Sequence, residues 1–312
     1  MLEIFLKTLP FFGIIGLGFA AGRTRFFTEE ATAYLTRFVF YFALSAMLFR
    51  FAANLDLLRI VDGRFIAAYL CATGLVYLLV TAVAYLRRRP AAEAAVEAQC
   101  ATIGNVGFLG VPMLVQLLGE RAIGSVIMVL ALDLIVFGSL IVIIITGARD
   151  GRMSPRVLRS VGLGLVRNPM IVSMTLGLVW SAWALPILAP VGEFLSILGA
   201  AATPGALFAI GASLASKSAE RVEVAAWLSF AKLVLHPAAV ALAALVIFPV
   251  EPFAAGVMIA AAALPTAGNV FILAQHYRVA PMRASATILF STVAGVVTVS
   301  LVVGWVSVVM QH

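Results

Sequence analysis

Charged residues are scarce in this sequence. Only 11% of its 312 residues are Asp, Glu, Lys or Arg, whereas 63% are hydrophobic, and the mean hydropathy is +1.11. A soluble domain needs more polar surface than this composition supplies, so soluble folds are excluded. The alternating pattern of membrane β-strands is also absent. The remaining class is an all-α polytopic membrane protein.

Residues that carry enzyme chemistry or bind metals are also few. The two cysteines, Cys71 and Cys100, lie in apolar runs, so we expect neither a disulfide framework nor a metal site. Neither His-Glu-x-x-His nor Gly-x-Ser-x-Gly occurs, and an intramembrane aspartyl protease would need a second acid beside Asp133. We therefore expect no enzyme and no cofactor. The basic residues are scattered, so no nucleic-acid partner is expected either.

Ten apolar runs are present, each close to the ~20 residues that cross the hydrocarbon core as a helix. They cover residues 4–21, 34–53, 65–86, 91–118 and 124–145, then 169–185, 191–215, 224–250, 252–277 and 284–310. Thr28 is a suitable N-cap for the second run. Because each half holds an odd number of runs, the second half must enter the membrane with opposite orientation. We predict ten transmembrane helices arranged as two inverted five-helix repeats.

Two of the runs are interrupted near their middles. In the ninth run, Pro265, Gly268 and Asn269 stand where a continuous spanning helix would carry Leu or Val. In the fourth run, Gly104-Asn-Val106 echoes Gly268-Asn-Val270. Helices four and nine are therefore predicted to be broken and to cross at mid-bilayer. Interrupted segments in matching places of two halves indicate a transporter site.

The distribution of Lys and Arg predicts the orientation. The connections after the odd-numbered runs carry 14 of these residues, and the opposite face carries 5. This excess assigns the first set of connections to the cytoplasm and both termini to the other side of the membrane. We expect a multi-pass protein of the bacterial cytoplasmic (inner) membrane.

Four motifs, in this order along the chain, resemble the auxin efflux carrier family. They are Leu165-Val-Arg-Asn-Pro169, Ala202-Thr-Pro-Gly-Ala-Leu-Phe-Ala-Ile-Gly-Ala-Ser-Leu214, Lys232-Leu-Val-Leu-His-Pro237 and Ala263-Leu-Pro-Thr-Ala-Gly-Asn-Val-Phe-Ile-Leu-Ala-Gln-His-Tyr277. The resemblance covers the whole chain. It is strongest to the compact bacterial branch, which includes carriers assigned to malonate and other small carboxylates.

The resemblance implies a fold similar to the bile acid:sodium symporters. Residues 1–62 and 169–218 would form a scaffold of helices 1–2 and 6–7, and residues 149–168 a cytoplasmic linker. Residues 63–148 and 219–312 would form a mobile transport unit of helices 3–5 and 8–10. Homodimers through the scaffold are expected. Plant members have a helix-breaking proline near the position of Val270, so here Gly268 and Asn269 are expected to break the helix.

The two breaks supply the candidate substrate site. Asn105 and Asn269 offer uncharged donors and an acceptor for a ligand, although each could instead cap its own broken helix. Gly104 and Gly268 belong to the same segments, whereas Pro112 and Pro265 are expected to shape the breaks. Half-helix N-termini after the breaks would favour a carboxylate. Thr266, Gln99 and Gln275 bind either ligand or a neighbouring helix.

Four ionisable residues, together with Gln99, are candidates for coupling transport to an ion, either H⁺ or Na⁺. Asp133 is the only acid deep in an apolar run, and it either carries a proton or pairs with Lys232. Lys232 is alternatively a fixed positive charge for an anionic substrate. His236 either moves protons or bonds a carbonyl freed by Pro237. Glu97 pairs with residues of the run Arg87 to Arg89 or helps bind a cation.

The sequence thus predicts a secondary transporter of small organic anions, such as malonate-like or auxin-like acids. An elevator-like movement of the crossed-helix unit would give alternating access. The alternatives are a sodium- or proton-coupled symporter of larger, bile-acid-like anions, and a ligand-sensing membrane protein without transport.

Overall fold

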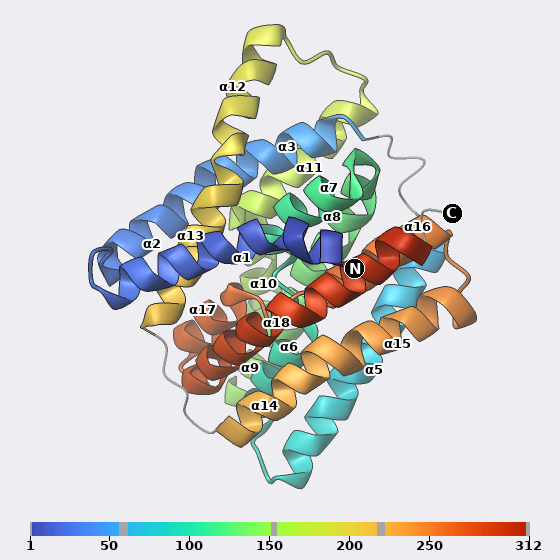
Figure 1. Cartoon of the computed structure of the whole chain (residues 1–312). Coiled ribbons are helices and arrows are strands. Elements are labelled where there is room, and N and C mark those ends of the chain that lie inside the picture. The colour runs from blue at the N-terminus through green and yellow to red at the C-terminus, as the bar shows by residue number, and fades with distance from the viewer. Residues whose placement is uncertain (1, 56–61, 151–154, 217–221, 310–312) are drawn as a thin grey trace.

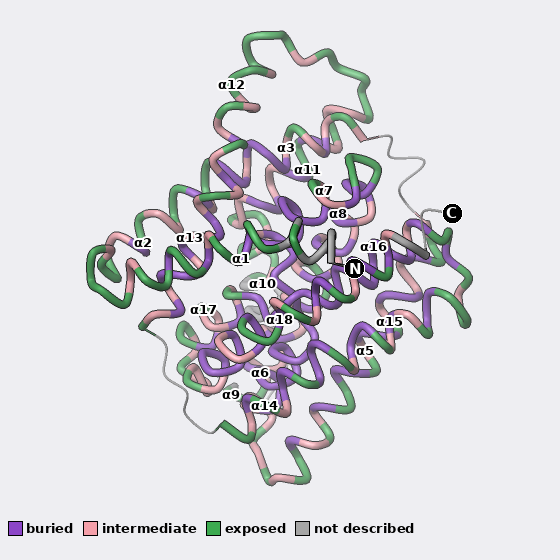
Figure 2. Tube along the Cα trace, viewed as in Figure 1, coloured by how far each residue is buried: buried purple, intermediate pink, exposed green. Residues whose placement is uncertain are grey.

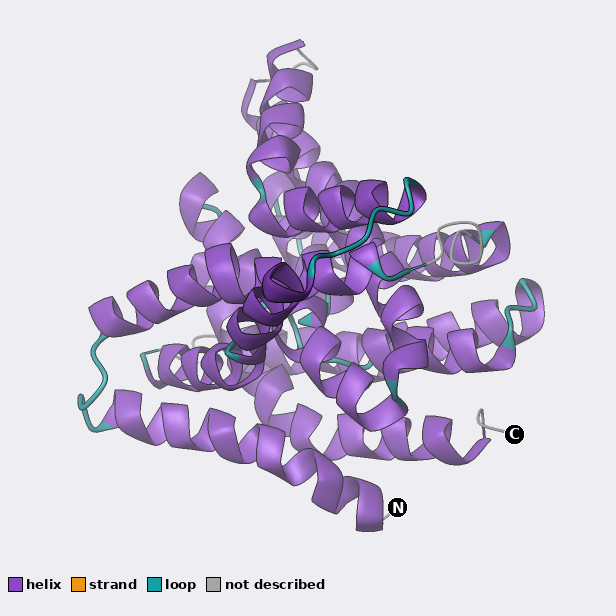
Figure 3. Ribbon diagram, turned by 90° about the horizontal axis from the view of Figure 1, so that it is seen from above, coloured by secondary structure: helices purple, strands orange, loops and turns teal. Residues whose placement is uncertain are grey.

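The computed structural model describes residues 2–55, 62–150, 155–216 and 222–309 (Figure 1). Within these ranges every regular element is a helix, and no strand is present (Figure 3). The prediction of an all-α protein is confirmed.

The described residues of the first half form eight α-helices, with short π or 3₁₀ segments (η) between them. They are α1 (Leu2–Arg23), α2 (Glu29–Phe38), η1 (Val39–Ala43), α3 (Leu44–Ala53), α5 (Gly63–Leu86), α6 (Ala91–Thr102), η2 (Val106–Gly110), α7 (Val111–Leu118), η3 (Glu120–Ala122), α8 (Ile123–Leu132), η4 (Asp133–Phe137) and α9 (Gly138–Asp150). Thr28 caps α2 as predicted, since its hydroxyl accepts from the Ala31 N–H at 3.1 Å.

The described residues of the second half also form α-helices with short π segments (η) between some of them. Its elements are α10 (Pro155–Arg167), α11 (Pro169–Ala182), α12 (Ala189–Ala200), α13 (Ala202–Ala215), α14 (Val222–Phe230), η5 (Ala231–Leu235), α15 (His236–Leu242), η6 (Ala243–Ile247), α16 (Pro252–Ala262), α17 (Gly268–Tyr277) and α18 (Pro281–Val309). The region 149–168, expected to be a connection, therefore contains a helix. Asn168 caps α11 by accepting from the Met170 N–H, and Pro169 opens the helix.

Six helical stretches of the described residues are long and apolar enough to cross a membrane. They are Glu29–Ala53, Gly63–Leu86, Glu120–Arg149, Ala189–Ala215, Val222–Ile247 and Pro281–Ser307. A seventh is added if the pair Val161–Arg167 and Pro169–Ala182, bent by 70°, is one span. The first, fourth and ninth predicted runs contain the shorter apolar helices Leu9–Arg23, Val106–Leu118 and Pro252–Ala262. The membrane character is confirmed, and ten spans in two inverted repeats stay a prediction.

The helices pack in two groups that each combine segments from both halves of the chain (Figure 1). In one group, α1 packs against α13 and α3 packs against α11 and α12. In the other group, α5 packs against α6 and α15, and α18 packs against α14, α16 and α17. The groups meet where α1 contacts α18 and where α13 contacts η2. The ends of α1 and α18 that lead to the two termini lie on the same side of the molecule (Figures 1 and 3).

The most deeply buried helices are α6 and α16 (Figure 2). Every residue from Ala94 to Thr102 is buried, and so is nearly every residue from Phe253 to Ala262. Alanines dominate both segments, so neighbouring helices approach closely without bulky side chains between them. The two deepest helices are thus those that lead into the predicted breaks.

Glycines allow α1 and α13 to pack closely against each other. A β-carbon at Gly211 of α13 would collide with the backbone of Ile15, and one at Gly18 of α1 with the backbone of Phe208. Such close approach gives dispersion contacts along the whole helix pair, which hold helices together in lipid where no hydrophobic effect acts between them.

We expect Gly211→Ala to destabilise the protein by roughly 1–3 kcal/mol, the usual cost of overpacking a close contact. Gly16→Ala is the matched control, because nothing lies within 4 Å of a β-carbon at this exposed position of α1. Thermal unfolding of the detergent-purified variants measures the difference. Equal melting temperatures for the two variants would show that the glycine contact does not stabilise the fold.

Candidate functional site

Two broken helices meet at the centre of the molecule. Helix α6 ends at Thr102 and the chain resumes helical form at Val106, while α16 ends at Ala262 and α17 begins at Gly268. The two interruptions run antiparallel and pair through their backbones. The Asn105 N–H donates to the Pro265 carbonyl at 2.8 Å, and the Ala267 N–H donates to the Ile103 carbonyl at 3.0 Å. Each break therefore supplies hydrogen-bond partners that the other break lacks.

The local sequence explains both interruptions. Pro265 has no N–H to continue α16, and its ring packs at 3.6 Å from the position of a β-carbon at Gly295. Gly104 allows the close crossing, because a β-carbon there would lie 3.1 Å from the Ala261 carbonyl oxygen and 3.4 Å from Lys232 Nζ. A larger residue at position 104 would push the two breaks apart.

The second break was predicted over Pro265, Gly268 and Asn269, and the structure confirms only the part at Pro265. Gly268 and Asn269 form the first turn of α17, and the interruption occupies residues 263–267 before them. The proline at position 265 and the bonds of Ala267 to the first break suffice to end the helix, so no breaker at position 268 is needed. Pro112 was also expected to shape a break, yet it lies inside α7 where proline is tolerated in the first turn.

The N-terminus of α17 is open. No side chain caps it, and Gly268 is exposed, with nothing within 4 Å of a β-carbon there. The side-chain amide of Asn269 makes no hydrogen bond within the described part of the chain, although its Oδ1 is shielded from solvent. The N–H groups of Gly268 and Asn269 and this amide have no hydrogen-bond partner in the described part of the chain, whereas the Val270 N–H donates to the Ala267 carbonyl at 3.2 Å.

Asn105 occupies a different position. It lies in the first break itself and is only 7% exposed. Its backbone N–H bonds to Pro265, and its carbonyl accepts from Leu109 and Gly110. The echo between Gly104-Asn105 and Gly268-Asn269 therefore does not correspond to equivalent places, because Gly104 faces Thr266 in the structure.

Thr266 joins three helices. Its hydroxyl donates to the Cys100 carbonyl at 2.7 Å, and its N–H donates to the Ser291 hydroxyl at 3.1 Å. Of the two roles considered for Thr266, the structure supports the interhelical hydrogen bond. Gln99 is buried and its Oε1 has no partner, whereas Gln275 is exposed on α17.

A second polar cluster lies behind the breaks and contains three of the four ionisable coupling candidates. Asp133 accepts a hydrogen bond from the Tyr69 hydroxyl at 2.6 Å, and its Oδ2 has no partner. Lys232 and Asp133 form no ion pair in the described structure, although their charges interact at longer range. Both residues lie in π segments, which often occur at functional sites.

Lys232 is fully buried and donates to the carbonyl of Ala262, the last residue of α16. The final carbonyls of a helix are unpaired and carry partial negative charge. The ammonium group therefore stabilises the interrupted end of α16 and fixes a positive charge beside Gly104.

His236 connects Lys232 to α5. Its Nδ1 lies 3.2 Å from Lys232 Nζ, and its Nε2 lies 3.0 Å from Thr73 Oγ1. An ammonium has only donors, so a charged Lys232 requires Nδ1 to accept and assigns the ring proton to Nε2, which then donates to Thr73. The hydrogen bond between Lys232 and His236 therefore exists only while the pair carries one positive charge. A second positive charge would place two donors opposite one another and break this bond.

The fourth coupling candidate, Glu97, lies in an ion network at the start of α6. Its carboxylate is fully buried and pairs with Arg87, which confirms the predicted pairing with the run Arg87 to Arg89. It also pairs with Arg283 of α18 at 2.9 Å. Arg283 lies 2.7 Å from a carboxylate oxygen of Glu93 as well. With two guanidinium groups on Glu97, the structure supports the pairing role over a cation site.

Several residues of these clusters were missed at the sequence level. Tyr69 and Thr73 stand one turn apart in an apolar helix, and this polar pair was the available signal. Ser291 and Arg283 gave no local signal, because they act on partners far away in the sequence.

Comparison with known proteins adds independent information. The model of a family described as membrane transport protein matches residues 3–303. A protein of Rhizobium meliloti (strain 1021) named "Putative malonate transporter" is 32% identical over 306 residues, which cover 96% of this chain and 95% of that protein. A protein of Escherichia coli (strain K12) named "Uncharacterized transporter YfdV" is 25% identical over 309 residues, covering 96% and 97%.

The ion network generates a prediction. Glu97→Gln keeps the side-chain volume but leaves Arg87 without its carboxylate and Arg283 with Glu93 alone, so we expect a loss of about 1–3 kcal/mol of stability. Glu93→Gln is the matched control, because Glu93 is partly exposed and the same Arg283 keeps Glu97. Thermal unfolding in detergent compares them. If the control loses as much stability as Glu97→Gln, the shared carboxylate is not the centre of the network.

Proposed function

The chain belongs to the membrane transport protein family, and from this premise we propose that it is a secondary carrier of small organic anions. Its family and its relatives are transporters, so the protein is a membrane transporter and not an enzyme. The substrate, the coupling ion and the mechanism are the proposed part.

The observation that carries the anion proposal is the open N-terminus of α17. The N-termini of α2, α11 and α16 are each capped by a side chain, namely Thr28, Asn168 and Glu251. The N-terminus of α17 has no such cap, and neither do those of α6 and α12. What distinguishes α17 is the side chain of Asn269 beside its start, whose buried Oδ1 has no partner. Free N–H groups at a helix start favour a carboxylate, and the amide adds donors without the cost of a buried charge.

A compact acid such as malonate is the proposed substrate class, with auxin-like acids as further members. The relative from Rhizobium meliloti carries the name of a malonate transporter. The buried ammonium of Lys232 beside Gly104 supplies a fixed positive charge at the crossing of the breaks. Two separate attractive features, the helix start and this ammonium, suit an anion with two carboxylates.

We propose alternating access by movement of the group containing α5–α9 and α14–α18 against the group containing α1–α3 and α11–α13. An asymmetry between the two breaks supports this. On α17, Gly268, Ile272, Gln275 and His276 are exposed, whereas residues Val111 to Leu114 of α7 are all buried. We propose that the crossing is open on the side of α17 and closed on the side of α7, and the distribution of basic residues assigns the α17 side to the cytoplasm.

We also propose that the protein resides in a bacterial cytoplasmic membrane with both termini outside, since ten spans place the two termini on one side and the basic residues assign the other side to the cytoplasm. The group containing α1–α3 and α11–α13 is the proposed dimer interface. The ends leading to the two termini lie on one side of the molecule, in agreement with this topology.

Protons are the proposed coupling ion. Asp133 has a carboxylate oxygen, Oδ2, without a partner, so a proton can bind there without breaking a hydrogen bond. The Tyr69 bond holds the other oxygen, and the shared charge of Lys232 and His236 responds to the charge of Asp133. The alternatives, sodium coupling with larger amphipathic anions or ligand sensing without transport, are outcomes of the experiments below.

We expect Asn269→Leu to abolish uptake of labelled malonate into proteoliposomes, because the amide next to the helix start is lost. Asn54→Leu, at the exposed end of α3, is the control and should transport normally. Elution as a single species and an unchanged melting temperature establish that both variants fold. Normal uptake by folded Asn269→Leu would remove this residue from the site. Binding without counterflow in the unaltered protein would favour a sensor.

For coupling, we expect an inward proton gradient to accelerate malonate uptake and a sodium gradient to have no effect. Asp133→Asn should abolish the response to the pH gradient while counterflow exchange of substrate continues, since the amide cannot bind the proton. Tyr69→Phe, which removes the hydrogen bond and keeps the carboxylate, should retain a response. A sodium-dependent rate, or an unchanged pH response in Asp133→Asn, would contradict the proposal.

A further inference from the structure

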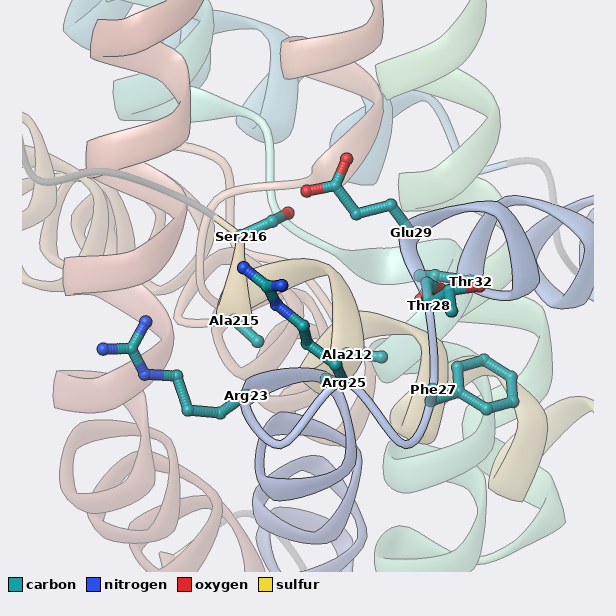
Figure 4. Close-up of a pocket in the computed structure, with 10 residues that line it drawn as sticks. Arg23, Arg25, Phe27, Thr28, Glu29, Thr32, Ala212, Ala215 and Ser216 are labelled. Atoms are coloured by element: carbon teal, nitrogen blue, oxygen red, sulfur yellow. Dashed lines mark hydrogen bonds between the residues drawn. The ribbon is translucent and has the colours of Figure 1, made fainter.

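A cavity lies outside the crossing of the broken helices, at the turn between α1 and α2. Its volume is about 400 Å³, and it lies against the C-terminal end of α13 (Figure 4). The floor consists of small residues, Gly22, Ala212 and Ala215, and a β-carbon at Gly22 would approach the Ala215 β-carbon to 2.8 Å. The cavity begins where this close contact between α1 and α13 ends. Its volume is large enough to hold a group of ligand size.

Two arginines line this cavity, and neither has a partner. Arg23 and Arg25 are both exposed, and within the described part of the chain their guanidinium groups form no ion pair or hydrogen bond. In contrast, Arg87 and Arg283 are paired with carboxylates. Glu29 also lines the cavity, but it stands in the first turn of α2, where the helix N-terminus stabilises its charge. The lining keeps an excess of positive charge.

The same turn carries an unusually exposed aromatic residue. Phe26 is 87% exposed, while its neighbour Phe27 packs edge-on against Phe208 with ring centroids 5.0 Å apart. The anchored Phe27 fixes the turn on α13, so Phe26 and the two arginines are held at the surface together. An aromatic side chain beside arginines is typical of the boundary between hydrocarbon and headgroups.

The position of the turn agrees with that boundary. The apolar helix α1 ends at Arg23, and the candidate span Glu29–Ala53 begins six residues later. A turn between two such helices lies where the chain leaves the hydrocarbon, on the side that the basic residues assign to the cytoplasm. This leaflet presents anionic headgroups.

We propose that this cavity binds the phosphodiester headgroup of an anionic phospholipid. Arg23 and Arg25 bind the phosphate oxygens, since guanidinium groups match phosphate geometry. Phe26 packs among the acyl chains beside it. The site is independent of the substrate proposal, because none of its lining residues belongs to the breaks or to the polar clusters behind them.

The test is the thermal stability of the detergent-purified full chain with added phosphatidylglycerol, compared with phosphatidylcholine. Phosphatidylglycerol should raise the melting temperature of the unaltered protein, and Arg25→Gln and Arg23→Gln should each lose most of that shift. Arg88→Gln is the matched control. Like Arg25, Arg88 is exposed and has a left-handed backbone conformation. Its φ is 56°, that of Arg25 is 61°, and it lies in another basic connection. This control should keep the full shift.

Each other outcome overturns the proposal. Equal shifts with both lipids would indicate no headgroup selectivity. Equal losses in Arg88→Gln and Arg25→Gln would indicate nonspecific charge attraction. Inorganic phosphate or glycerol phosphate as effective as the lipid would indicate a site for free anions. Retained shifts in both cavity variants would place the lipid elsewhere, and their melting temperatures in phosphatidylcholine alone report whether they fold.

Discussion

Hydrocarbon offers no hydrogen bonds, and this constraint governs the centre of the molecule. A helix that stops in the middle of a bilayer leaves several N–H and carbonyl groups unpaired, at a cost of several kcal/mol for each. Here two interruptions satisfy one another, through Asn105 with Pro265 and Ala267 with Ile103. The Thr266 hydroxyl bonds a further free carbonyl, that of Cys100. The open start of α17 exists only because the rest of the crossing is satisfied.

The few buried charges follow the same logic. Lys232 is held by the carbonyl end of α16, and Glu97 is held by two arginines. The first contact attaches η5 to α16, and the second attaches α6 to α18 and to Arg87 after α5. Asp133 differs, since it has one hydrogen bond and one free oxygen. It is the buried carboxylate whose protonation disturbs the fewest contacts, which is why the coupling proposal centres on it.

The features that could be predicted from the sequence are those that depend on composition or on residues close to one another in the chain. Runs of apolar residues predicted the helices, Pro265 and Gly104 predicted the interruptions, and Thr28 predicted a cap. The prediction extended the second break too far, to Gly268 and Asn269, because Gly268 looks like a helix breaker until Ala267 is seen to bond Ile103. Similarly, Arg283 was not connected to Glu97, since their contact spans 186 residues. Contacts between residues far apart in the sequence depend on how the helices pack in three dimensions. Local sequence patterns carry no information about that packing.

The mutual bonding of the two breaks has a consequence for biosynthesis. Thr266 lies 166 residues after Cys100, whose carbonyl it bonds, so about half the chain must be made before the first interruption finds its partners. Until then, residues 103–105 must be hydrated or sheltered by the insertion machinery. The first half of the chain therefore cannot satisfy its own break, and the crossing closes only after the segment around Thr266 has been made.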